Sequence, residues 1–146
     1  MIVSTPTFHV AEPPAQYLHR PPLVVDCSTL AGLVFREPWW ADALARIEGR
    51  ELHAPNILQA EIANVAVKKL RRGETHATEG LAQAVAMEID LHRLDAEAVA
   101  ALAQRYNLSA SDAAYLWLAA ELKAPLATFD AKLSEAARVH LATLRG

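Results

Sequence analysis

The chain has 146 residues, of which 53% are hydrophobic, so it is long enough for one domain with a core and too short for two. Its 14 basic and 17 acidic residues give a net charge of -3, which excludes the global positive field of a nonspecific nucleic-acid binder. A single cysteine excludes an intrachain disulfide framework and a cysteine-rich zinc ribbon, which suits a reducing cytoplasm.

The N-terminal segment, residues 1–22, holds five of the eight prolines, which fix φ and remove backbone donors. We expect an arm without regular structure there and a single domain over residues 23–146. The segment lacks the basic start and apolar stretch of a signal peptide, and nowhere does the chain approach about eighteen consecutive apolar residues. The resulting expectations are a cytoplasmic location and no contact with a membrane.

From residue 23 onward, strand-like and helix-like patterns alternate. Strands are predicted at Leu23–Cys27, Glu51–Ala54, Ile89–Leu94 and Leu126–Phe129, with a last edge strand at His140–Leu144. Helices are predicted at residues 28–35, 38–49, 56–72, 75–88, 95–106, 109–122 and 131–139, the first of them capped by Ser28. Strands separated by helices pair in parallel through right-handed crossovers. The predicted fold class is therefore α/β, a three-layer α/β/α sandwich with a central, mainly parallel sheet.

Four acidic residues are placed where such a fold puts its ligand site, beyond the carboxyl ends of the strands. Asp26 lies at the end of the first predicted strand, and Asp130 directly follows the strand before the last helix. Asp112 falls in the first turn of the alanine-rich helix. Glu61 lies at the edge of the apolar arc of the longest helix, from where it can reach over the core.

Each acid also has a purely structural interpretation. Asp130 can be a helix N-cap, Asp112 fits a capping box, and Glu61 can be a solvated residue. Asp26 is the hardest to explain in this way, because Ser28 is already assigned as the cap of the following helix. A shared site is favoured because one fold brings all four acids to one edge of the sheet.

Carboxylates that gather at one place raise one another's pKa unless a cation neutralises them. No lysine or arginine lies within two positions of Asp26, Glu61 or Asp112, and Lys132 is the only one that close to Asp130. An all-oxygen site suits Mg²⁺ or Mn²⁺, and Mg²⁺ readily shares its coordination with substrate phosphates. The pattern therefore predicts metal-assisted phosphoryl chemistry.

The segments around these acids resemble the PIN-domain ribonuclease family, in particular the VapC-like toxins of toxin-antitoxin pairs. The matching segments are Val24–Ser28, Gln59–Val65, Leu108–Tyr115 and Leu126–Leu133. They follow one another in the order and at the spacing of the family. The resemblance covers residues 23–144 and leaves the N-terminal arm unexplained.

The resemblance implies a Mg²⁺- or Mn²⁺-dependent endoribonuclease that is the toxin half of such a pair. It implies four catalytic metal ligands and two nearby hydroxyls that help to bind the cofactor: Asp26, Glu61, Asp112 and Asp130, with Ser28 and Thr128. It also implies an RNA substrate, a cognate antitoxin whose tail covers the acidic cleft, and a homodimer. Leu133 occupies a stretch where some relatives carry a further acid, so a fifth ligand is not expected.

Two alternatives compete with this interpretation. One is a catalytically inactive PIN-like module that binds RNA or protein, against which the four intact acids argue. The other is a receiver-like phospho-acceptor domain, which the lack of an adjacent acid pair near Asp26 disfavours.

The other reactive and charged residues have less specific interpretations. Cys27 is expected to pack rather than to act as a nucleophile. The six histidines lack zinc-like spacing and are interpreted as scattered surface residues or as residues whose hydrogen bonds are satisfied. The basic cluster within Lys68–Arg72 either complements a helix C-terminus or contacts RNA. Of Trp39 and Trp40, one is expected to pack and the other to be free for a partner or a base. Apolar residues on the first two short helices exceed what a small sheet can cover, which indicates contact with another chain.

Overall fold

The computed structural model describes residues 6–9, 11 and 20–144, so most of the predicted N-terminal arm lies outside the described residues. The strands within this part are β1 (Pro22–Val25), β2 (Glu51–Pro55), β3 (Ile89–His92) and β4 (Leu126–Ala127). The helices are α2 (Cys27–Val34), α3 (Trp40–Ile47), α4 (Leu58–Arg71), α5 (Ala77–Ala86), α6 (Ala96–Tyr106), α7 (Ala110–Leu122) and α8 (Ala131–Ala142). None of these helices has the length and apolar character needed to cross a membrane.

The four strands form one parallel sheet in the order β3-β2-β1-β4. β1 is central: Leu23 lies opposite Leu52 of β2, and Val24 lies opposite Leu126 of β4. Because the carboxyl ends of parallel strands meet at the same edge, the chain leaves β1 and β4 on the same side of the sheet. This edge is where the sequence predicted the functional residues.

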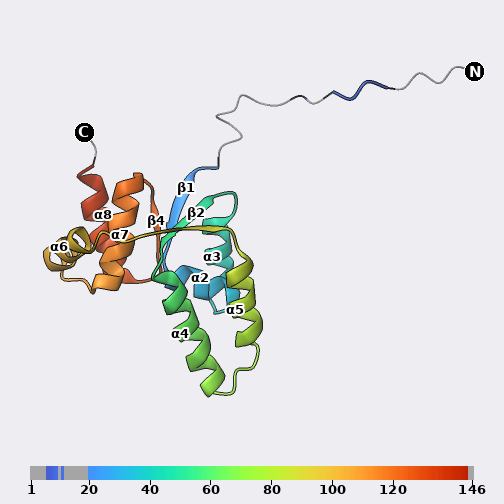
Figure 1. The fold of residues 1–146 in the computed structure, drawn as a ribbon, viewed down its shortest axis with the longest axis horizontal. Coiled ribbons are helices and arrows are strands. Elements are labelled where there is room, and N and C mark those ends of the chain that lie inside the picture. Colours follow the sequence, from blue (N-terminus) through green and yellow to red (C-terminus); the bar gives the residue numbers. More distant parts are fainter. Residues whose placement is uncertain (1–5, 10, 12–19, 145–146) are drawn as a thin grey trace, which may run out of the picture.

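Helices cover both faces of the sheet, which confirms the predicted α/β/α sandwich. α7 contacts β1, β2 and β4, while α8 contacts β4 and α6 packs against α7. α2 packs against α3, α4 and α5. Figure 1 shows the group α6 to α8 on one side of the strands and the group α2 to α5 on the other.

The core follows from the alternation of side chains along β1. Val24 belongs to the larger buried cluster, whereas Leu23 and Val25 belong to a smaller one on the opposite face. Tyr115 and Leu116 of α7 are among the most completely buried side chains. α7 is therefore an internal helix, and its N-terminal turn is held rigidly at the sheet edge.

The predicted cap of the first helix is wrong. Asp26, not Ser28, is the N-cap of α2, and its carboxylate accepts the backbone N–H of Thr29 at 3.0 Å. Consequently β1 ends one residue before Asp26 and the helix begins at Cys27. Asp26 has an extended backbone, with φ -90° and ψ 176°, which is the geometry of an N-cap residue.

The predicted edge strand at His140–Leu144 is also wrong, because α8 continues through it to Ala142. Leu133 and Ala137 belong to the main core, and Leu141 packs against it. These residues repeat every four positions, so a helix places all of them on one face. A strand would have turned alternate residues to opposite faces.

A buried lysine clamps the C-terminal end of α4, the helix that carries one of the four predicted acids. Lys69 is 7% exposed, and its Nζ lies 2.5 Å from Glu37 Oε1 and 3.6 Å from Glu74 Oε1. Its ammonium group also lies 5.6 Å from the centroid of the Phe35 ring. Within the predicted basic cluster, Lys69 is thus a structural cation, while its neighbour Lys68 is exposed.

Replacing Lys69 by Met should destabilise the fold, because the partly buried Glu37 carboxylate would lose its partner. Removing one member of a buried pair costs several kcal/mol, and the partial exposure of Glu37 lowers the figure here to about 2–3 kcal/mol. Urea denaturation measures the loss. The control is Lys68→Met, which should change the free energy of unfolding by less than about 0.5 kcal/mol. Equal losses in both variants would contradict the clamp.

Candidate active site

Asp26 lies at the edge of the sheet, between β1 and α2, and is only 5% exposed. Its Oδ1 accepts hydrogen bonds from Ser28 Oγ at 2.7 Å and from the backbone N–H and hydroxyl of Thr29, each at 3.0 Å. Its Oδ2 accepts a hydrogen bond from the hydroxyl of Thr128, which follows β4. Oδ1 is thereby fully satisfied, whereas Oδ2 keeps capacity for one further ligand.

The two hydroxyls that contact Asp26 also order the segment after β4. Ser28 Oγ accepts the backbone N–H of Phe129 at 2.9 Å, and Thr128 Oγ1 accepts that of Asp130 at 3.0 Å. Asp130 Oδ1 in turn accepts the N–H of Leu133 at 2.9 Å and caps α8. The structural role considered for Asp130 is therefore real, and it engages one of the two carboxylate oxygens.

Glu61 extends from α4 and is held in place by Tyr115 of α7. The hydroxyl of Tyr115, a residue only 1% exposed, donates to Glu61 Oε1 at 2.5 Å. Burial raises the pKa of Glu61, the hydrogen bond from Tyr115 opposes this, and the negative charges of Asp112 and Asp26 raise it further. Burial and the bond to Glu61 raise the pKa of Tyr115, so its hydroxyl stays protonated and acts as the donor.

Asp112 lies in the first turn of α7, where Ser109 is the N-cap. Ser109 Oγ accepts the backbone N–H of Asp112 at 3.1 Å. Burial raises the pKa of the Asp112 carboxyl, and the charges of Asp130 and Asp26 add to the rise. A hydrogen bond with the Ser109 side chain and the positive charge of Lys132 lower this pKa.

These mutual effects on pKa show that the structure brings the four predicted acids into one region. Glu61 is influenced by Asp112 and Asp26, and Asp112 by Asp130 and Asp26. Among the described residues, no three of them have carboxylate oxygens that all lie within 4.8 Å of one another. The donor set is all oxygen and carries excess negative charge, which fits a hard divalent cation that retains some of its water ligands.

Cys27 lies beside these acids but has the properties of a packing residue. It is partly buried against the main core as the first residue of α2. Burial, followed by the charges of Glu61 and Asp26, raises the pKa of its thiol to about 12. The thiol is protonated at neutral pH, which agrees with the prediction that Cys27 is not a nucleophile.

An aromatic pair with an attached cation borders the acids. The rings of Trp39 and Phe129 have centroids 6.0 Å apart, and Phe129 directly precedes the cap of α8. The Trp39 indole N–H donates to the carbonyl of Ser28 at 3.3 Å. The indole lies so close to Gly32 that a Cβ there would be 2.3 Å from Nε1. The guanidinium of Arg46 lies 5.5 Å from the centroid of the Phe129 ring.

The expectation that one of the two adjacent tryptophans packs while the other is free is wrong. Trp39 is 37% exposed and Trp40 39% exposed, and Trp40 lies against the guanidinium of Arg36. Trp39 both packs and stays accessible, because Gly32 has no side chain and lets the ring approach the helix backbone. The exposed apolar surface on the first two short helices is smaller than predicted. Of their large apolar side chains, only Trp39, Trp40 and Leu44 are exposed.

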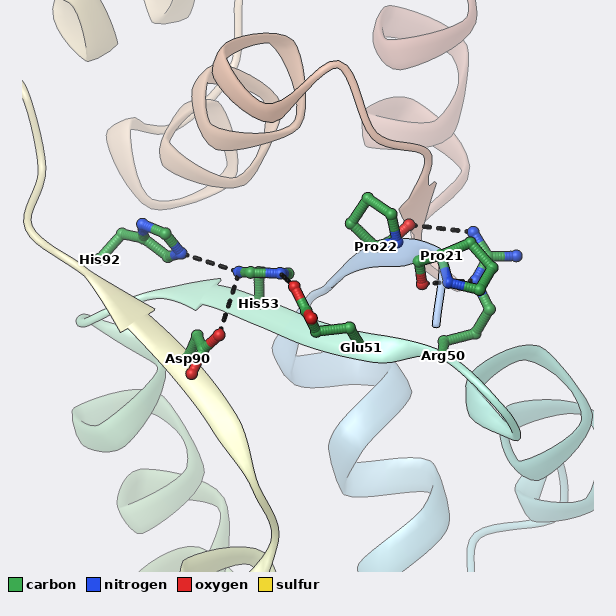
Figure 2. Close-up of polar contacts among 7 residues, drawn as sticks. All are labelled: Pro21, Pro22, Arg50, Glu51, His53, Asp90 and His92. Atoms are coloured by element: carbon green, nitrogen blue, oxygen red, sulfur yellow. Dashed lines mark hydrogen bonds and ion pairs between the residues drawn. The ribbon is translucent and has the colours of Figure 1, made fainter. Parts of the chain in front are cut away.

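Tyr115 and a histidine cluster are the residues that the sequence analysis missed. Tyr115 lies three residues after Asp112 on one helix face, which was the available signal. Figure 2 shows His53 of β2 beside His92 and Asp90 of β3. Asp90 and His92 occupy alternate positions on a short strand and therefore share a face, which was the only local sign of this cluster.

This histidine cluster could hold a metal. Glu51, His53 and Asp90 offer ligand atoms that all lie within 4.8 Å of one another, and His92 adds a fourth titratable side chain. His53 and His92 are therefore not scattered surface residues, and their hydrogen bonds agree with the other interpretation, that of satisfied side chains. Sheet pairing sets His53 opposite Asp90, two positions from His92, and so brings the two histidines together although they are far apart in the sequence.

Glu61→Gln should stabilise the metal-free protein at neutral pH. The pKa of Glu61 is raised on folding, so the folded protein favours the protonated form of this side chain. Protonated Glu61 contributes its full stabilisation of the fold below its ordinary pKa of 4.5, and this contribution is lost as pH rises through the raised pKa. Glutamine keeps an acceptor for Tyr115 without the charge. Denaturation in chelator from acidic to mildly alkaline pH should show an advantage of the variant that grows with pH. Exposed Glu97→Gln is the control, and a Glu61→Gln protein less stable than wild type at neutral pH would contradict the expectation.

Comparison with known proteins agrees with this architecture. Residues 23–139 match the PIN domain family. The crystal structure of PAE2754 from Pyrobaculum aerophilum has a similar fold, with a TM-score of 0.62 and 21% sequence identity over 84% of this chain and 90% of that one. No curated protein matches the chain. PIN domains are typically metal-dependent nucleases that act on RNA. The family match covers most of the chain, and the parallel sheet with acids at its carboxyl edge agrees with it. The chain therefore belongs to the PIN-domain family.

Proposed function

We propose that the protein is a Mg²⁺- or Mn²⁺-dependent endoribonuclease and the toxin component of a toxin-antitoxin pair. The observation that carries the proposal is the electrostatic coupling of four acids at the carboxyl edge of a PIN-domain sheet. The catalytic and metal-binding residues of the proposal are Asp26, Glu61, Asp112 and Asp130. Burial and the charges of neighbouring carboxylates raise the pKa of Glu61 and of Asp112, and such a pair is difficult to explain without a cation that binds there.

The residues of the chain hold this site in a defined geometry. Ser28 and Thr128 orient Asp26, and Tyr115 occupies Oε1 of Glu61 and leaves Oε2 free. When bound, a divalent cation lowers the pKa of a coordinated water and stabilises negative charge on the scissile phosphate. Asp112 contributes a carboxylate from the first turn of α7, where burial and the charges of Asp130 and Asp26 raise its pKa. The protein thus supplies position and charge rather than a covalent nucleophile.

The aromatic pair beside the acids supports single-stranded RNA as the substrate. Unpaired bases stack on aromatic rings, and this contact tolerates many sequences. Trp39 and Phe129 offer such rings next to the acids, and Arg46 places a positive charge on Phe129. A local cation of this kind can contact a phosphate although the whole chain is weakly acidic.

An apolar groove supports the proposal of a protein partner. It has a volume of about 370 Å³ and lies between α2, α4, α5 and β3. Its lining is mostly apolar and includes Leu30, Leu58, Ile62, Leu81, Met87 and Ile89. At its border Val85 is 77% exposed, so the apolar surface continues beyond the groove. A short amphipathic segment of an antitoxin fits such a groove, and a homodimer through another face completes the proposal.

One observation favours the alternative, a catalytically inactive PIN-like module that binds RNA or protein. Asp26 is 5% exposed, and three donors satisfy its Oδ1, as expected of a helix cap alone. Substituting Asp26 therefore mixes an effect on folding with any effect on catalysis. Asp112 is the better residue for a decisive test.

Asp112→Asn should lower the rate of RNA cleavage by at least about 100-fold, as expected when one preorganised charged group is lost from an active site. Chelator should abolish wild-type cleavage, and Mg²⁺ or Mn²⁺ should restore it. The control is Asp95→Asn, which alters the cap of α6, where Asp95 Oδ1 accepts the N–H of Ala98 at 3.1 Å. It should cleave like wild type.

The same variants test the toxin role. Induced wild-type protein should arrest growth, and Asp112→Asn should not. Full cleavage by a folded Asp112→Asn protein would refute the nuclease assignment. RNA binding without any cleavage by wild type would support the inactive module instead.

Trp39→Ala should weaken RNA binding by roughly 5- to 150-fold, because base stacking on an aromatic ring contributes about 1–3 kcal/mol per base. Binding is measured in the Asp112→Asn background, so that the RNA stays intact. Trp40→Ala is the matched control and should bind RNA nearly as well as its parent. Melting temperatures of both variants report any loss of packing, and equal effects on RNA affinity would remove the special role of Trp39.

A further inference from the structure

The histidine cluster on β2 and β3 is a connected set of polar contacts around one buried imidazole. His53 is 7% exposed, and its Nδ1 lies 2.9 Å from His92 Nε2 and 3.8 Å from Asp90 Oδ2. Its Nε2 lies 2.6 Å from Glu51 Oε1. Figure 2 shows the side chains of Glu51, Asp90 and His92 directed towards His53 from the two strands. Both ring nitrogens of this histidine are therefore engaged.

The sheet itself holds the cluster together. The parallel register pairs His53 with Asp90 across β2 and β3. Side chains two positions apart on a strand share a face, so Glu51 lies on the face of His53, and His92 on that of Asp90. Strands hold side chains more rigidly than loops, so the four groups are preorganised.

The hydrogen bonds define which nitrogen is available. An ionised carboxylate can only accept a hydrogen bond, so His53 Nε2 carries a proton and donates it in a hydrogen bond to Glu51. The network then assigns the lone pair of neutral His53 to Nδ1, which is directed towards His92 and Asp90. The N–H of His92 Nε2 donates to this lone pair. When a metal ion binds between the two nitrogens, neutral His92 carries its proton on Nδ1 instead, so that Nε2 also offers a lone pair.

We propose that this cluster is a binding site for Zn²⁺ or a similar borderline divalent metal. His53 Nδ1, His92 Nε2 and Asp90 Oδ2 are the ligands, and a solvent molecule completes a tetrahedron. With metal-ligand bonds of about 2.0–2.1 Å, ligand atoms in a tetrahedral site lie about 3.3–3.4 Å apart. Two of the three separations between these ligand atoms, 2.9 Å from His53 Nδ1 to His92 Nε2 and 3.8 Å from His53 Nδ1 to Asp90 Oδ2, bracket this value. The third requires His92 and Asp90 to move towards each other, because among the described residues only Glu51, His53 and Asp90 have ligand atoms that all lie within 4.8 Å of one another.

Glu51 is the positioning residue of the site. A carboxylate that accepts the second N–H of a ligating histidine fixes the tautomer and makes the imidazole a stronger ligand. Glu51 is free for this role because the neighbouring Arg50 donates to the carbonyls of Pro21 and Pro22, at 3.2 Å and 3.0 Å, and not to the carboxylate (Figure 2).

Access and selectivity follow from the same residues. The side chain of Asp90 is 70% exposed, and an open cavity of about 540 Å³ adjoins Glu51 and Asp90, which provides a path for the ion. Two imidazoles with one carboxylate suit Zn²⁺ or Co²⁺ better than Mg²⁺. Because the ligands join β2 to the edge strand β3, the bound metal should tighten this edge of the sheet.

Cobalt titration of the whole chain tests the site. In excess Mg²⁺, which occupies the proposed nuclease site, Co²⁺ should give wild type the intense visible absorption of a tetrahedral complex, which should saturate at one Co²⁺ per chain, and Zn²⁺ should displace it. His92→Gln should abolish this absorption, and Glu51→Ala should weaken Co²⁺ binding about 10- to 100-fold. His76→Gln, which removes an exposed histidine on another element, should retain the full signal.

Two further measurements separate this site from the proposed nuclease site. Asp112→Asn should keep the Co²⁺ absorption, and excess Mg²⁺ should not remove it. Exposed Asp90→Ala provides a second ligand variant in case His92→Gln perturbs folding. Absence of tetrahedral Co²⁺ absorption in wild type, or unchanged binding in His92→Gln or in Asp90→Ala, would overturn the proposal and leave a hydrogen-bonded chain that only joins two strands.

Discussion

The carboxylate of Asp26 holds together three elements on which the rest of the site depends. It ends the central strand, caps α2 through Thr29 and accepts the hydroxyl of Thr128 from the segment after β4. Ser28 reinforces this junction by bonding both Asp26 and the backbone of Phe129. Because these contacts saturate one carboxylate oxygen and leave capacity on the other, the residue serves structure and ligand binding at the same time.

Around this junction the fold holds negative charges close to one another in spite of their repulsion. The buried helix α7 carries Asp112 at its N-terminal turn and Tyr115 one turn further on, and Tyr115 holds Glu61 by a hydrogen bond. Burial first, and then the neighbouring negative charges, raise the pKa of Glu61 and of Asp112, which is the cost of this arrangement. Packing of α7 in the core offsets that cost, and a bound cation would relieve it.

The two polar clusters of the molecule differ in origin and therefore in chemistry. The acids at the sheet edge come from strand ends and helix starts, where carboxylates also act as caps. The cluster around His53 lies within paired strands, where the register brings imidazoles and carboxylates face to face. The first is an all-oxygen set for a hard cation, and the second has nitrogen donors that suit a borderline metal. Their ions are therefore distinguishable by experiment.

The local pattern of the sequence was enough for the α/β class, the parallel sheet and the position of all four acids, because apolar periodicity and strand-end residues are local properties. Tertiary structure alone decided which of two neighbouring residues caps a helix and which residues distant in the sequence contact each other. Asp26, and not Ser28, is the N-cap of α2, because the backbone is still extended at Asp26. The contact of His53 with His92, 39 residues apart, depends on strand register, which no local pattern of residues encodes.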